Sequence, residues 1–147
     1  MMLGGIDFPL FYKYIKLTCI QLDIFLSILL WLNGLTIKRA GENCANSNLM
    51  GLYQAGKKEI LICENNISDQ KISKSEVIKH EYVHYVYDKK KIESTIIIDP
   101  IFSYLIKNFI SDGEKLFVFV HETDYSSDEE LEARFLSRLP TIVLFFI

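Results

Sequence analysis

Two histidines and a glutamate stand at a spacing that suits metal chemistry. His80, Glu81 and His84 belong to the run His-Glu-Tyr-Val-His. On an α-helix of 3.6 residues per turn, side chains four residues apart share a face, so His80 and His84 can offer two imidazoles to one ion. Glu81 directly follows the first imidazole, where its carboxylate can hold a metal-bound water and accept its proton. The spacing therefore predicts a metal centre that activates water.

This pattern is specific for a chain of this size. Two of the three histidines among the 147 residues fall in it. By chance, His-Glu-x-x-His would appear in roughly one chain of this length in several hundred. The uncharged residues around the histidines allow the helix to be buried: Tyr82, Val83, Tyr85 and Val86. The alternative is a buried helix whose histidines are satisfied by neighbouring polar groups.

Capping residues independently predict this helix. Ser73-x-x-Glu76 has the form of a capping box, which starts a helix at about Lys74. The helix should end near Asp88, where the lysines at 89–91 suit its negative C-terminal end. Both histidines then lie in the middle of the helix.

The run from His80 to His84 resembles the signature helix of the zincin metallopeptidases, and the flanking residues agree with the extended family pattern: Val77, Ile78, Tyr85 and Val86. No His-x-x-Gly-x-x-His continuation follows His84, which excludes the metzincin branch. The remaining resemblance is to gluzincins, in which a glutamate on a later helix supplies the third ligand. It covers about residues 50–138 and is loose outside the signature helix.

The resemblance implies zinc-dependent hydrolysis of peptide bonds in a peptide or protein substrate. In this scheme His80, His84 and Glu132 bind Zn²⁺ and leave a fourth position for water. Zinc lowers the pKa of that water to roughly 7, and Glu81 passes its proton to the leaving amine. No residue is assigned to stabilise the oxyanion, for which Tyr125 and His121 are the candidates.

The third ligand is expected on a C-terminal helix over residues 128–139, capped by Ser127 or Asp128 and ended by Pro140. Its buried stripe should consist of Leu131, Phe135 and Leu139.

Glu132 lies beside this stripe and precedes Ala133, as in the gluzincin pattern where a small residue lets two helices approach. Glu129 is the second candidate, Glu130 should point away, and His121 is a weaker alternative. All three glutamates could instead merely favour the N-terminus of their helix.

A β-hairpin is predicted before the signature helix, because the apolar runs 49–54 and 59–63 flank a polar turn that contains Gly56. In zincins the strand before the signature helix borders the cleft and pairs with an extended substrate. Tyr53 or the strand Ile60–Cys63 would have that position here.

Residues 1–35 are rich in apolar side chains. The longest run, 24–32, is too short for a bilayer, which needs ~20 apolar residues. We expect a packed helix over residues 10–33 that ends at Asn33-Gly34. Interfacial membrane association through this segment is a second hypothesis.

Further along, Pro100 should open a helix that continues to Ile110 and stops at Ser111-Asp112-Gly113. Residues 115–120 suggest a strand. The apolar tail 141–147 suggests a core strand, a partner surface or a truncated reading frame. Of the three cysteines, Cys44 and Cys63 could pair in an exported chain, but reduced buried thiols are the favoured interpretation.

These features predict a single α+β domain over residues 1–147, with an apolar N-terminal helix over 1–35 and a zincin-like core over 49–139. That core should hold a short sheet, the signature helix and a glutamate-bearing helix. A net charge of −3 argues against nucleic acid as a partner. The alternatives to a peptidase are a non-catalytic zinc-binding regulator or adaptor and a small membrane-associated protein with a coincidental motif. A cytoplasmic or membrane-associated location is compatible with the sequence.

Overall fold

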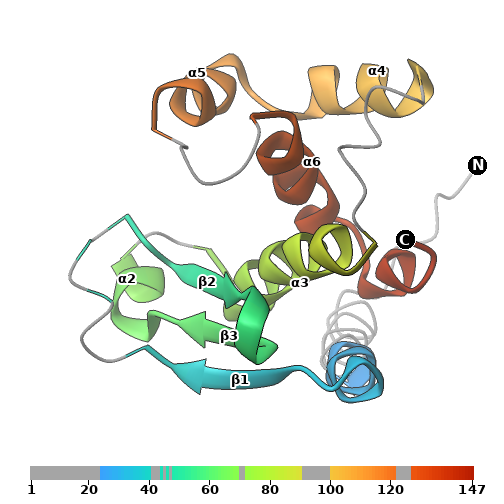
Figure 1. Cartoon of the computed structure of the whole chain (residues 1–147). Coiled ribbons are helices and arrows are strands. Elements are labelled where there is room, and N and C mark those ends of the chain that lie inside the picture. The colour runs from blue at the N-terminus through green and yellow to red at the C-terminus, as the bar shows by residue number, and fades with distance from the viewer. Residues whose placement is uncertain are drawn as a thin grey trace, which may run out of the picture.

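The computed structural model describes residues 24–40, 44, 46, 48–69, 72–90, 100–121 and 127–147. Within them the chain is α+β, as expected from the sequence, with most of the helices on one side of a small mixed sheet (Figure 1). The predictions for residues 1–23 and Tyr125 lie outside the described residues.

The sheet has three strands in the order β1–β3–β2: β1 (Thr36–Arg39), β2 (Gly51–Gln54) and β3 (Glu59–Ile62). β2 and β3 form the predicted antiparallel hairpin, joined by the short 3-10 helix η2 (Ala55–Lys57). Lys58 follows with a φ of 53°. β1 is parallel to β3 on its other side. β3 is thus the central strand, and β2 lies at an edge.

Residues 24–33 are helical, in agreement with the C-terminal part of the predicted N-terminal helix. Its end has the pattern of a Schellman motif: the N–H of Gly34, at a φ of 66°, donates to Trp31 O, and the N–H of Leu35 donates to Leu30 O. The Asn33 side chain then reaches the signature helix, since its amide donates to Tyr82 Oη at 3.2 Å. This contact attaches the first described helix to the helix that carries the motif.

The signature helix is α3 (Lys74–Lys90), two residues longer than predicted and with the predicted start. Ser73 Oγ accepts a hydrogen bond from the N–H of Glu76 at 3.1 Å, as the capping box requires. The short helix α2 (Glu64–Asp69) precedes it. In Figure 1, α3 lies between the sheet and α6 (Ser127–Arg138), the predicted glutamate-bearing helix.

Two predictions on the C-terminal side of α3 have different outcomes. α4 (Pro100–Phe109) forms as predicted, but the strand over 115–120 is wrong, because these residues belong to α5 (Asp112–His121). The reason is a second capping box: Ser111 Oγ accepts from the N–H of Glu114, and the Glu114 carboxylate accepts from the N–H of Ser111. This local capping outweighs the β preference of the apolar residues that follow.

The apolar tail forms the 3-10 helix η4 (Thr141–Phe145), so the core-strand interpretation is also wrong. Leu144 is buried, and the Phe145 ring meets Phe25 edge to face at a centroid distance of 6.4 Å. The end of the chain thus packs against the first described helix.

One main hydrophobic cluster contains residues from the 24–33 helix, the sheet, α3 to α6 and η4. Several apolar side chains of the 24–33 helix stay exposed, with Trp31 the most exposed at 77%. None of the described helices has the length and apolarity that a membrane span requires. Interfacial membrane association remains a prediction.

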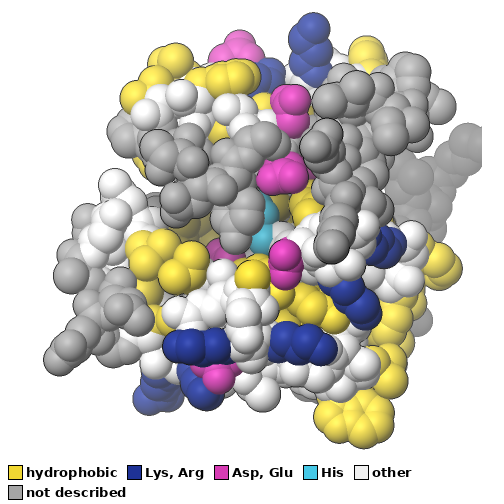
Figure 2. Space-filling model, viewed as in Figure 1, with side chains coloured by type: hydrophobic (Ala, Val, Ile, Leu, Met, Phe, Trp, Pro, Cys, Tyr) yellow, Lys and Arg dark blue, Asp and Glu magenta, His cyan; other side chains and the backbone are white. Residues whose placement is uncertain are grey.

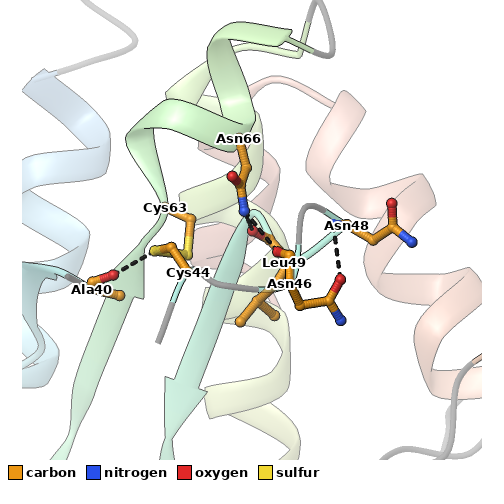
Figure 3. Close-up of a disulfide and its surroundings, with 7 residues drawn as sticks. All are labelled: Ala40, Cys44, Asn46, Asn48, Leu49, Cys63 and Asn66. Atoms are coloured by element: carbon orange, nitrogen blue, oxygen red, sulfur yellow. Dashed lines mark hydrogen bonds between the residues drawn. A yellow bond between two sulfur atoms is a disulfide. The ribbon is translucent and has the colours of Figure 1, made fainter. Parts of the chain in front are cut away.

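The interpretation of all cysteines as reduced thiols is wrong for one pair, because Cys44 and Cys63 form a disulfide (Figure 3). The bond connects the segment before β2 to the end of β3. The Asn66 side chain also holds the segment before β2, because its amide donates hydrogen bonds to Asn46 O at 2.8 Å and to Leu49 O at 2.7 Å. The pair is the one considered for an exported chain, and 19 residues separate its two cysteines.

Reducing this disulfide should destabilise the fold. The chain-entropy model assigns about 3 kcal/mol to a loop of this size. We expect Cys44→Ser to lower the free energy of unfolding by about that amount in urea titrations, with the oxidised wild type as the reference. Finding more than one reactive thiol per native chain would contradict the bond.

Candidate metal centre

The two motif histidines lie one turn apart in the middle of α3, and their ring nitrogens converge. His80 Nε2 and His84 Nε2 are 3.2 Å apart, and the ring planes meet edge to face at 76°. His84 is 2% exposed, so its imidazole is almost completely removed from solvent. As their i, i+4 spacing predicts, His80 and His84 therefore lie on one face of α3.

Glu130 on α6 completes a triangle with the two histidines. Its Oε2 lies 3.2 Å from His80 Nε2 and 3.3 Å from His84 Nε2. Ligand atoms around a tetrahedral zinc, with bonds of about 2.0–2.1 Å, lie about 3.3 Å from one another. The donor set and its spacing thus fit a metal ion, and among the described residues His80, His84 and Glu130 form the group that could hold one.

The expectation that Glu130 points away is wrong, and the cluster contains Glu130 in place of Glu132. Glu132 is buried, at 1% exposure, but on another side of α6. Glu129, the second candidate, also lies outside the cluster. His121 ends α5, and its side chain is outside the described residues.

The helical period explains this correction. Glu130 and Glu132 are separated by about 200° around the helix axis, so they cannot face the same site. The stripe towards the cleft is Glu130, Arg134 and Ser137, at i, i+4 and i+7. Ala133 is completely buried, and α6 packs against α3, as the sequence predicted. The apolar stripe of Leu131 and Phe135 had suggested that the glutamate beside it faces the histidines, but Glu130 on another face of α6 does so.

The electrostatic environments of the two histidines differ. Burial acts to lower the pKa of His80, but its hydrogen bond and charge interaction with Glu130 outweigh this and raise the pKa. Burial lowers the pKa of His84, and the contact with Glu130 does not offset it. His80 is therefore the more basic of the two imidazoles.

Two carboxylates beside the histidines have opposite shifts. Burial acts to raise the pKa of Glu130, but hydrogen bonds from His80 and His84 and the charge of Arg134 hold it far below its usual range. Burial raises the pKa of Glu81, although His80 and the N–H of Tyr53 act against the rise. Glu130 therefore stays ionised, whereas Glu81 is the stronger base.

Glu81 is fixed by the edge strand. Its Oε2 accepts a hydrogen bond from the backbone N–H of Tyr53 at 2.8 Å. Gly51, two residues earlier on β2, makes this approach possible: a Cβ there would lie 2.7 Å from Val77 Cγ1 and 2.9 Å from Glu81 Cγ. Real Cβ atoms do not tolerate such distances. The absence of a side chain at Gly51 thus lets β2 lie directly against Glu81.

Gly51→Ala should therefore destabilise the protein, because the added methyl group must displace α3 or the Glu81 side chain. Overpacking of this kind typically costs about 1–3 kcal/mol. Gly56→Ala is the matched control in the same hairpin, since nothing lies within 4 Å of a Cβ at that position. Urea midpoints of the two variants measure the difference, and equal midpoints would contradict this account of Gly51.

The site opens into a cleft of about 200 Å³. One wall is the segment Asn48–Leu52, the other is α6 with Arg134, Ser137 and Arg138, and α3 contributes the histidines and Glu81. In Figure 2 a histidine side chain is visible in a hollow bordered by acidic side chains. The pair of histidines is thus buried but accessible from one side.

Of the two strands proposed to border the cleft, β2 has that position. Gly51 and Leu52 line the cleft, whereas Tyr53 contacts the site only through the hydrogen bond of its N–H to Glu81. The suggestion of Ile60–Cys63 is wrong, because β3 pairs with strands on both sides. The N–H of Cys63 donates to Met50 O, and the alternation of an antiparallel ladder then turns the backbone groups of Gly51 and Tyr53 towards the open edge. The hydrogen bond from Tyr53 to Glu81 agrees with this register.

Comparison of the chain with protein-family models, with curated proteins and with solved structures found no match.

Proposed function

We propose that this protein is a zinc-dependent peptidase. The observation that carries the proposal is the convergence of His80 Nε2, His84 Nε2 and Glu130 Oε2 within 3.3 Å of one another, in a cleft that Glu81 also lines. Two imidazoles and one carboxylate are the protein ligands of many hydrolytic zinc sites, which keep a fourth position open.

Each residue of the site has a separate role in this proposal. His80, His84 and Glu130 would hold the ion, which when bound would supply a water whose pKa is lowered to about 7. Glu81 accepts a proton in the attack on the scissile carbonyl and returns it to the leaving amine. Its hydrogen bond from Tyr53 fixes the carboxylate, and its burial strengthens it as a base.

The edge strand suits an extended peptide as substrate. The outward backbone groups of β2 beside the cleft can pair with a peptide chain by strand addition. The N–H of Tyr53 is already used by Glu81, so Gly51 and the carbonyl of Tyr53 would provide the pairing groups.

Metal removal tests this function. Cleavage of a broad peptide mixture, followed by mass spectrometry, should stop when a chelator removes the metal from the protein. It should return when stoichiometric Zn²⁺ is added. Cleavage that persists in the metal-free protein would contradict a zinc mechanism. Thermal unfolding of the stripped protein is the control that it remains folded.

A further inference from the structure

Arg134 contacts the oxygen of Glu130 that the histidines do not use. Its Nε donates to Glu130 Oε1 at 2.7 Å, whereas Oε2 of the same carboxylate faces the two imidazoles. The side chains are 22% and 4% exposed, respectively, so the pair is largely shielded from water. The two residues lie one turn apart on α6, which places the guanidinium directly above the carboxylate.

Arg134 is itself held in place from a second helix. Its guanidinium lies over the Phe117 ring of α5, with Cζ 5.6 Å from the ring centroid. An arginine is always charged and has a planar set of donors, which suits it for both contacts. The guanidinium is thus fixed between an aromatic ring and the carboxylate.

The physical consequence concerns how Glu130 can bind an ion. A carboxylate with both oxygens available can bind through either or both, but here a charge-assisted hydrogen bond occupies Oε1. Oε2 is then the atom presented beside the imidazoles, and a ligand position stays open for water. Partners of this kind orient metal ligands, and their loss commonly costs about 10–100-fold in metal affinity.

We propose that Arg134 is a positioning residue of the metal centre, which holds Oε1 of Glu130 so that Oε2 alone meets the ion. This inference rests on the metal site of the proposed function and goes beyond it by assigning a role to a residue that is not a ligand.

The zinc affinity of the 147-residue chain tests this role, measured by competition with a chromophoric chelator. Arg134→Met removes the donors and should weaken binding by about 10–100-fold. Arg134→Lys keeps the charge but not the planar geometry and should give an intermediate loss. Arg138→Met is the matched control, because Arg138 lines the same cleft and pairs with Glu76 and Glu114 instead of Glu130. Its affinity should equal that of the wild type.

A second readout separates positioning from a purely structural role. The visible absorption of bound Co²⁺ reports coordination number, so Arg134→Lys and Arg134→Met should change the spectrum if Glu130 shifts towards binding through both oxygens. Equal affinity and an unchanged Co²⁺ spectrum in folded Arg134 variants would overturn the proposal, even if they unfold at a lower temperature. If Arg134→Met does not fold, Arg134→Lys alone decides. Absence of metal binding by the wild type would overturn the metal site as well.

Discussion

Glu81→Gln is expected to keep the metal and lose hydrolysis. Glu81 is not one of the three converging ligands, and the amide oxygen of glutamine can still accept the hydrogen bond from Tyr53. An amide cannot take up the proton, however, and general-base assistance is commonly worth ~10²–10⁴-fold in rate. Peptide mixtures analysed by mass spectrometry, with wild type beside Glu81→Gln at equal zinc content, measure the loss.

Two other outcomes of this experiment are informative. Products common to both proteins would indicate a contaminating protease or another mechanism, and the role assigned to Glu81 would then be wrong. A biological activity that Glu81→Gln leaves unchanged would favour the alternative of a zinc-binding regulator or adaptor without turnover.

The second large effect is expected from the third ligand. Glu130→Ala removes one of the three proposed protein ligands and leaves Arg134 without its carboxylate partner. Loss of a residue that only orients a ligand costs up to about 100-fold in metal affinity, so loss of the ligand itself should lower zinc affinity by more than that. Glu132→Gln is the matched control: the residue is equally buried on the same helix but is outside the cluster. Its folded fraction should bind zinc like the wild type.

Glu129→Ala provides a further comparison, because a carboxylate near the start of a helix contributes only ~0.3–1 kcal/mol to stability. Zinc titrations of the three variants rank the candidates directly. Loss of the metal from Glu132→Gln with retention in Glu130→Ala would restore the assignment made from sequence and contradict the observed geometry.

The elements around the histidines could be predicted because their signals are local. The i, i+4 spacing, the Ser73 cap and the turn after Gln54 each act within a few residues, and α3 and the hairpin formed accordingly. The close contact of β2 with Glu81 could not be predicted, because it depends on how Gly51 packs against a helix distant in sequence.

The orientation of Glu130 shows where the prediction from the apolar pattern failed. On α6 the apolar stripe suggested one face, whereas the site uses the face with Glu130, Ala133 and Ser137. A signal was present: small residues at i+3 and i+7 allow two helices to approach, and Arg134 at i+4 is a ready partner for Glu130. The same limit applies to α5, where the cap formed by Ser111 and Glu114 decided the structure against β propensity.

The most direct test of the metal centre is the metal content of the protein purified without added zinc. Elemental analysis should find about one zinc per chain in the wild type and none in His84→Ala, because the loss of one buried imidazole leaves too few ligands to hold the ion. Correctly folded wild-type protein without metal, which also takes up none when zinc is supplied, would contradict the account.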